Sequence, residues 1–345
     1  MKKRAGAWVR GAVMMAAAWL VMTGCKPSGA AGGGAGEGGG GGSKRLMVGF
    51  LPKSKGNAYF VSCREGAESA AKDLGVELVF DGPVSPDPAR QSEIVENWIS
   101  LGMDAMAVAC ENKDGISTAL RKARAKGIPV VTFDADALAD ARDYFVNQAT
   151  PEGIGNALMD EAARLCGGSG QFAIITASLT AQNMVEWQRR IEARRVEKHP
   201  GMTLVALRPC DDLKDRAQAE ATTLMGAHPD LRLIMAICSP AVPGTAEAVK
   251  QAGKAGKVRV IGLGLPSENR RYLKEGVTDT VFLWKTADLG GLAVRVATGL
   301  ARGEMKAVLA EFDAGPMGKF PVRGTEVILG EPFRFTRENV DRFNF

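Results

Sequence analysis

The stretch GIPVVTFDAD, from Gly127 to Asp136, decides the fold. Ile128 to Phe133 is a short run of apolar and β-branched residues, which is typical of a buried parallel strand. Two acids, Asp134 and Asp136, follow it directly. Ligands of open α/β sheets bind just beyond the carboxyl ends of the strands, so a carboxylate here is placed to accept hydrogen bonds from a polyol. The alternative is that Asp134 caps a helix or a turn, as aspartate often does.

Strands and helices alternate on both sides of this stretch. In the first half, strands are expected at 46–50, 76–80, 104–110, 128–133 and 144–148, with helices between them. The pattern repeats with strands at 171–176, 204–207, 231–238, 258–263 and 280–284, and ends with a helix at 287–301 and a strand at 325–329. Such alternation predicts parallel sheets covered by helices on both faces. The similar strands GIPVVTFD and GKVRVIGL suggest two α/β lobes with a cleft between them.

Composition excludes some classes of protein. The chain has 345 residues, of which 46% are hydrophobic and 24% charged, as in ordinary globular proteins. Four of the positive charges behind the net charge of +5 lie in the first ten residues, so the balance gives no argument for nucleic-acid binding. The six cysteines show no C-x-x-C spacing, which disfavours a zinc or thioredoxin-type site, and four of them lie in apolar stretches typical of buried thiols.

The first 43 residues read as a leader and a tether. A basic start and a short apolar segment are typical of a secretory signal, and VMTGC at Val21–Cys25 resembles a bacterial lipoprotein cleavage site. We therefore expect a lipoprotein signal peptide over 1–25, with lipidation of Cys25. An ordinary signal peptide cut nearby and an uncleaved anchor are the alternatives. The Gly-, Ala- and Ser-rich tract at 26–43 is expected to be a flexible tether.

Seven motifs between Lys44 and Phe345 carry a family resemblance. They are VGFLPK (Val48–Lys53), TFDAD (Thr132–Asp136), YFVNQ (Tyr144–Gln148), SLTAQN (Ser178–Asn183), VIGLGLPS (Val260–Ser267), FLW (Phe282–Trp284) and NVDRFNF (Asn339–Phe345). Together they resemble the type I periplasmic sugar-binding proteins of ABC transporters, in the branch of the rhamnose and autoinducer-2 receptors. The resemblance implies two Rossmann-like lobes joined by a three-crossing hinge.

The same resemblance implies a ligand site in the cleft. In such a site, acids, amides and a lysine bind the hydroxyl groups of a sugar, and aromatic rings pack against its apolar face. For several positions a structural role is the alternative: a solvated loop for Lys53, capping for Gln182 and Asn183, and core packing for Phe60 and Trp284. The expected ligand-binding residues are Lys53, Asn57, Tyr59, Phe60, Asp134, Asp136, Gln182, Asn183, Ser239 and Trp284.

Two departures from the autoinducer-2 branch favour another ligand. That branch has an acid before its Gln-Asn pair, where this chain has Ala181. It also has a Pro-Asp-Ala step where this chain has Ile237, Cys238 and Ser239. The loss of two acids favours a rhamnose-like monosaccharide.

The resemblance also sets expectations for organisation. We expect a first lobe at 44–147 and 285–313, a second lobe at 148–284 and 314–345, and hinge crossings near Gln148, Gly264–Pro266 and Lys285–Asp288. The expected protein is a monomer, lipid-anchored at a membrane in the periplasm or cell envelope, that delivers its sugar to an ABC permease. No metal, other cofactor or nucleic-acid partner is expected.

A sugar sensor and a carbohydrate-acting enzyme are the alternative functions. A sugar sensor for a membrane kinase would have the same fold, and the sequence does not separate it from a transport protein. A carbohydrate-acting enzyme is disfavoured, because Asp134 and Asp136 share one strand end instead of facing each other across a bond. The two histidines, His199 and His228, each directly precede a proline at an expected helix end, which is typical of surface turns.

Overall fold

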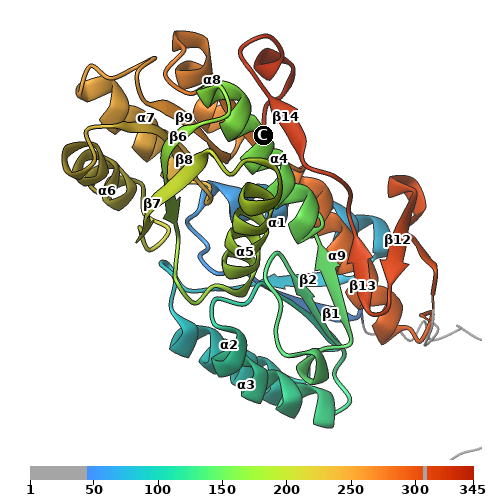
Figure 1. Ribbon diagram of the computed structural model, residues 1–345. Helices are drawn as coiled ribbons and strands as arrows, with labels where there is room; N and C mark the ends of the chain where they lie inside the picture. Colours follow the sequence, from blue (N-terminus) through green and yellow to red (C-terminus); the bar gives the residue numbers. More distant parts are fainter. Residues whose placement is uncertain (1–44, 306–308) are drawn as a thin grey trace, which may run out of the picture. The chain divides into compact units, whose positions relative to one another are not determined.

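The computed structural model describes residues 45–305 and 309–345, which form two α/β lobes (Figure 1). The predicted signal peptide, the tether and Cys25 lie outside the described residues. Each lobe has one largely parallel sheet with helices against it, and the fold class expected from the sequence is confirmed. Within the described residues, no helix has the length and apolar character needed to cross a membrane.

The first lobe contains an eight-stranded sheet with the order β11-β12-β13-β5-β4-β3-β1-β2. Its central strands are apolar and buried on both faces, as parallel strands between helices require. Helices α1 (Ala58–Leu74), α2 (Pro88–Leu101), α3 (Lys113–Ala125) and α9 (Thr286–Ala301) belong to this lobe. The strands are β1 (Met47–Leu51), β2 (Glu77–Phe80), β3 (Ala105–Val108), β4 (Val130–Phe133), β5 (Tyr144–Asn147), β11 (Glu311–Asp313), β12 (Lys319–Arg323) and β13 (Glu326–Ile328).

The second lobe contains a six-stranded sheet with the order β14-β10-β9-β8-β6-β7. All its pairings are parallel except that of β14 with β10. Its helices are α4 (Pro151–Cys166), α5 (Gln182–Lys198), α6 (Lys214–Ala227), α7 (Ala241–Gln251) and α8 (Pro266–Glu275). The strands are β6 (Gly170–Thr176), β7 (Met202–Pro209), β8 (Leu231–Ala236), β9 (Arg259–Leu263), β10 (Thr280–Leu283) and β14 (Phe333–Phe335).

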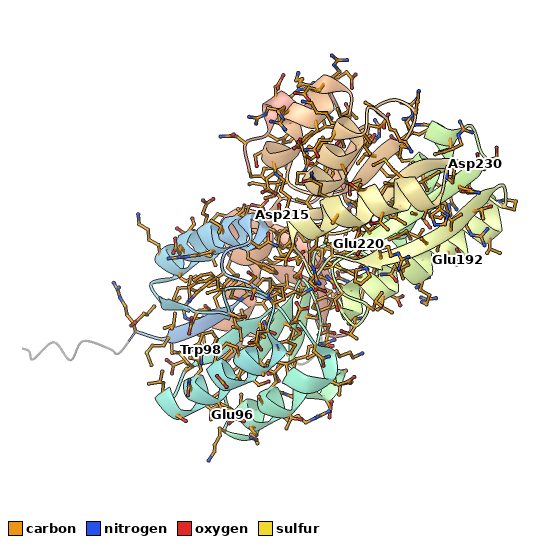
Figure 2. The ribbon with its side chains drawn as sticks, turned by 90° about the vertical axis from the view of Figure 1, so that its left-hand side faces the viewer. Glu96, Trp98, Glu192, Asp215, Glu220 and Asp230 are labelled. Atoms are coloured by element: carbon orange, nitrogen blue, oxygen red, sulfur yellow. The ribbon has the colours of Figure 1, made fainter. Side chains whose placement is uncertain are left out.

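Local sequence explains where elements begin and how closely they pack. Thr150 caps α4 by accepting from the Gly153 amide, and Pro151 occupies the first turn, where no amide donor is needed. Trp98 on α2 packs over β1 at Gly49, where a Cβ would lie 2.5 Å from a ring carbon of Trp98 (Figure 2). Helix and sheet can approach this closely only because residue 49 has no side chain.

Three short segments connect the lobes: 148–150, 284–285 and 329–332. The expected crossings near Gln148 and Lys285 agree with this, but the expectation for Gly264–Pro266 was wrong, because that segment joins β9 to α8 inside the second lobe. The real third crossing connects β13 to β14.

The chain end is divided between the lobes, which corrects the expected boundary. The expected second lobe includes all of 314–345, whereas β12 and β13 belong to the sheet of the first lobe. Strand β13 pairs in parallel with β5, with Val327 opposite Val146, and so extends the first sheet. Only β14, which pairs with β10 through Phe335 and Val281, joins the second sheet.

Glu161 on α4 holds β14 and β10 against the helix of the second lobe. Its carboxylate accepts from the Thr280 hydroxyl at 2.5 Å and from the Arg334 guanidinium at 2.7 Å, and Arg164 adds two more bonds at 2.8 and 2.9 Å. Burial by itself raises the pKa of Glu161, but these hydrogen bonds outweigh it and lower the pKa from 4.5 to about 2. The ionised form therefore stabilises the folded state.

Glu161→Gln is expected to lower the free energy of unfolding at neutral pH by about 1.5–3 kcal/mol, the range for hydrogen bonds to a charged group. Because the folded-state pKa lies below the ordinary value, wild type keeps this contribution above pH 4.5 and loses it as the pH falls towards 2. The difference between wild type and variant should shrink over that window in urea titrations. Glu197→Gln, at an exposed pair with Lys198, is the matched control and should change little. A pH-independent difference would contradict this account.

Candidate ligand-binding site

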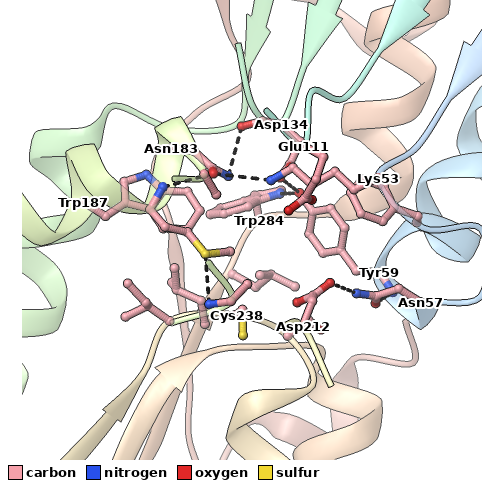
Figure 3. A pocket seen from close by; sticks show the side chains of 18 residues that line it. Lys53, Asn57, Tyr59, Glu111, Asp134, Asn183, Trp187, Asp212, Cys238 and Trp284 are labelled. Atoms are coloured by element: carbon pink, nitrogen blue, oxygen red, sulfur yellow. Dashed lines mark hydrogen bonds and ion pairs between the residues drawn. The ribbon is translucent and has the colours of Figure 1, made fainter. Parts of the chain in front are cut away.

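A pocket lies where the carboxyl ends of the strands of both sheets meet (Figure 3). Its free volume is about 40 Å³, which is room for only a few water molecules. Loops that follow β1, β3 and β4 supply polar groups from the first lobe, and loops that follow β6, β7 and β8 supply groups from the second. The lining residues are Lys53, Asn57, Tyr59, Phe60, Glu111, Asp134, Ala177, Ala181, Asn183, Met184, Trp187, Asp212, Ile237, Cys238, Ser239, Leu263, Leu283 and Trp284.

A buried ion pair forms the polar centre of this pocket. The Lys53 ammonium lies 3.2 Å from the Asp134 carboxylate, and the two side chains are 6% and 7% exposed. The Tyr59 hydroxyl donates to Asp134 at 3.0 Å and accepts from the Trp284 indole at 2.8 Å. This chain of contacts fixes the orientation of four side chains from separate elements, as buried charges require.

The backbone of Asp134 is held in an unusual conformation. Its φ of 61° is left-handed, a region that aspartate tolerates better than most residues. The side-chain amides of Gln148 and Asn183 donate to its carbonyl oxygen at 3.0 and 3.4 Å. The carboxylate contacts Lys53 and Tyr59. Within the described residues, Asp134 therefore does not act as a helix or turn cap.

Direct contacts across the pocket join the two lobes. The Asn57 side chain donates to Asp212 at 2.7 Å, while its oxygen caps α1 by accepting from the Tyr59 amide at 3.0 Å. The Lys53 ammonium also reaches the Asn183 oxygen at 3.4 Å. Asp212 follows Asp211 in a turn in which both residues have positive φ, 51° and 56°. These contacts occupy groups that a ligand would otherwise meet.

The acids of the pocket outnumber its bases. Burial by itself lowers the pKa of Lys53, but the carboxylates of Asp134, Glu111 and Asp212 outweigh it and raise the pKa. Burial raises the pKa of Glu111 and that of Asp212, and the charge of Lys53 opposes the shift in both. Among the lining residues three acidic side chains therefore face one ammonium group.

Aromatic rings form the apolar wall. Trp284 lies 6.2 Å from both Trp187 and Tyr59, centroid to centroid, and Tyr59 meets Phe60 edge-to-face at 5.1 Å. Phe60 also packs against the core residue Phe133, so it serves the core as well as the pocket. Flat rings beside hydrogen-bonding groups suit a ring-shaped ligand with apolar faces and polar edges.

Two of the expected site residues lie outside the pocket lining. Asp136 is turned into the first lobe, where Arg142 binds it through two nitrogens at 2.8 Å and the Thr132 hydroxyl donates to it at 2.5 Å. Gln182 begins α5 without lining the pocket. The structure brings the other eight together: Lys53, Asn57, Tyr59, Phe60, Asp134, Asn183, Ser239 and Trp284.

Sequence reasoning missed two acids and a tryptophan. Glu111 follows β3 and Asp212 follows β7, so the rule that selected Asp134 at a strand end would have selected both. Trp187 sits on the α5 face that meets Trp284 and has no such signal. Ser239 lines the pocket, and its buried hydroxyl has no hydrogen-bond partner among the described residues. Those residues contain no cluster of three or more potential metal ligands.

A two-lobed α/β chain with one largely parallel sheet in each lobe has the fold of the type I periplasmic binding proteins. Residues 48–305 match the family model described as periplasmic binding protein domain, and the chain belongs to this family.

Proteins similar to this chain are found both by sequence and by structure. The D-ribose/D-allose-binding protein of Pseudomonas aeruginosa is 29% identical over 66% of this chain and 74% of its own length. A solute-binding protein of an ABC transporter from Clostridium phytofermentas, solved with bound L-rhamnose, is 29% identical, with a TM-score of 0.83 over 87% of this chain and 98% of that one. A sugar ABC transporter protein from Actinomyces odontolyticus is 31% identical, with a TM-score of 0.71 over the same shares. LsrB from Clostridium saccharobutylicum, solved with AI-2, has a TM-score of 0.83 at 23% identity, a likeness of fold alone.

Proposed function

We propose that this protein is an extracytoplasmic sugar receptor that captures one monosaccharide between its lobes and delivers it to an ABC permease. The observation that carries the proposal is the buried Lys53–Asp134 pair within a pocket of amides, acids and aromatic rings. Such groups bind hydroxyls through charge-assisted hydrogen bonds while the rings cover the apolar face. The named ligands of the relatives from Pseudomonas aeruginosa and Clostridium phytofermentas support a sugar.

A rhamnose-like deoxyhexose is the favoured ligand. Support comes from the 29% identity to the protein solved with L-rhamnose and from the apolar lining at Ala181 and Cys238, where the autoinducer-2 branch is expected to carry acids. The three acids Glu111, Asp134 and Asp212, set against the single ammonium group of Lys53, disfavour sugar acids and sugar phosphates, because like charges repel strongly in a desolvated site.

Binding requires the lobes to separate and close again. The free volume of about 40 Å³ holds only a few waters, and the Asn57–Asp212 and Lys53–Asn183 contacts close the space from both sides. The crossings at 148–150, 284–285 and 329–332 are the segments in which backbone rotation would open the pocket. The sugar would then replace the contacts between the lobes with its own hydroxyl groups.

The cell-envelope part of the proposal rests on the sequence. A lipid on Cys25 and a flexible tract at 26–43 would hold the receptor at a membrane while leaving its lobes free to reach a permease. Growth with labelled palmitate should label the wild-type chain and leave Cys25→Ser unlabelled. Label on both, or on neither, would contradict lipidation at this cysteine.

A thermal-shift screen of the full chain tests the ligand. A sugar at a hundredfold excess over its dissociation constant stabilises the folded state by about 2.7 kcal/mol, which is a readily measured shift. L-rhamnose is expected to stabilise the protein, and rhamnose 1-phosphate and uronic acids are not. The panel includes ribose, allose, arabinose and autoinducer-2.

Each outcome of the screen decides something. Stabilisation by autoinducer-2 alone would show that this ligand binds without acids at positions 181 and 238. Stabilisation by a pentose or an aldohexose alone would keep the class and replace the sugar. Lack of response to every sugar at millimolar concentration would overturn the proposal.

A further inference from the structure

Two cysteines meet in the wall of the pocket. Cys210 follows β7 directly and Cys238 comes two residues after β8, and these strands lie on either side of β6 in the sheet. Their Sγ atoms are 3.5 Å apart, and the side chains are 0% and 3% exposed. The structure also describes Cys63, Cys110 and Cys166, which are buried free thiols.

The loop next to this pair carries a polar group of the pocket. The amides of Cys210 and Asp211 donate to the carbonyls of Thr176 and Ala177 at 2.8 Å each, which anchors the loop to the end of β6. Asp211 and Asp212 then turn through left-handed conformations, and the turn presents Asp212 to Asn57 of the other lobe. Two consecutive left-handed residues are strained, and a strained turn needs support from its surroundings.

We propose that Cys210 and Cys238 form a disulfide that braces this turn, which makes the pocket wall a redox-modification site. The sulfurs need to approach by about 1.5 Å to reach the bond length of 2.03–2.05 Å, a movement within reach of side-chain rotation. Membership of a periplasmic binding family places the pair in a compartment where disulfides form and persist. This inference rests on the extracytoplasmic location in the proposed function, and the identity of the ligand does not affect it.

The oxidant is a small-molecule or protein disulfide. Cys238 lines the pocket and is the thiol that an oxidant meets when the lobes separate. Its thiolate attacks the oxidant, which forms a mixed disulfide and releases one thiolate. The Cys210 thiolate then attacks Cys238 Sγ, which forms the Cys210–Cys238 bond and releases the second sulfur of the oxidant as a thiolate. The two protons lost by the cysteines pass through solvent to the two released thiolates, which become thiols. The two electrons reduce the oxidant to its two thiols.

The closed pocket should slow this reaction. Burial raises the pKa of the Cys238 thiol well above its usual range, so little thiolate is present while the lobes are closed. Oxidation therefore depends on opening, and a ligand that holds the lobes together should protect the pair.

Peptide mapping of the full chain after treatment with oxidised glutathione tests the assignment. Remaining thiols are alkylated before digestion without reductant. The expected product is a peptide pair linked through Cys210 and Cys238 and lighter by two hydrogens than the two free peptides. Cys166→Ala, which removes a buried thiol of the same lobe, should keep the link, and Cys210→Ala should lose it. Complete alkylation of both thiols, or separate glutathione adducts on each, would overturn the proposal.

Thermal unfolding separates a brace from an incidental link. Reduction with dithiothreitol should lower the unfolding midpoint of the wild type by roughly 5 °C, because the disulfide constrains the unfolded chain. The Cys210→Ala/Cys238→Ala double variant should show no such change on reduction. A linked wild type whose midpoint does not respond to reductant would contradict a bracing role.

Discussion

Asp134→Ala is expected to weaken sugar binding by about 10- to 100-fold. A hydrogen bond to a charged group contributes about 1.5–3 kcal/mol, and each 1.4 kcal/mol corresponds to a tenfold change in affinity. The variant loses the carboxylate and also frees Lys53 and Tyr59, both of which it orients. Isothermal titration with the sugar that stabilises the wild type measures this loss.

The same variant is expected to lose stability, because Lys53 would remain buried without its partner. Removing one member of a buried ion pair costs about 3–5 kcal/mol, measurable in urea titrations without ligand. Asp134→Asn is the matched control, since asparagine tolerates the φ of 61° and keeps the side-chain shape. It should bind poorly, as the alanine variant does, because it lacks the charge. Wild-type affinity in both variants would remove Asp134 from the site.

Asp136→Ala is expected to lose stability but to keep its sugar affinity, although Asp136 lies only two residues beyond Asp134 in the chain. The loss should be about 3–5 kcal/mol of stability, because Arg142 would be left buried without its bidentate partner. Arg142 also donates to the Thr325 hydroxyl at 2.5 Å and thus connects β4 to the turn before β13. Urea titration measures the loss of stability, and sugar affinity at low temperature should stay within about threefold of wild type.

Arg142→Ala is the partner test for this structural role. It should destabilise the chain by a similar amount, and the double variant should lose much less than the sum of the two single losses, because both remove one interaction. If Asp136→Ala instead lowered affinity more than tenfold at unchanged stability, Asp136 would belong to the ligand site after all.

Much of the fold can be read from local patterns in the sequence. Apolar runs such as Ile128–Phe133 specify buried parallel strands, and signals such as Thr150-Pro151 specify helix starts, because these depend on neighbouring residues alone. The resemblance of the motifs to a family added the two lobes and eight of the residues that line the pocket. The expected lobe for the chain end was wrong, because no local pattern in 319–328 predicts that β13 pairs with β5, more than 170 residues earlier.

The sequence by itself determined the class of fold and placed acids at the carboxyl ends of strands, where open α/β sheets bind ligands. The tertiary structure alone decided which acid uses that position. Asp134 and Asp136 are equivalent on a strand pattern of period two, but the left-handed turn at Asp134 sends its carboxylate to Lys53, while Arg142 draws Asp136 into the lobe. The tertiary structure also brought Asp212 to Asn57 and Cys210 to Cys238, because these partners lie on different elements and meet only when the sheets are assembled.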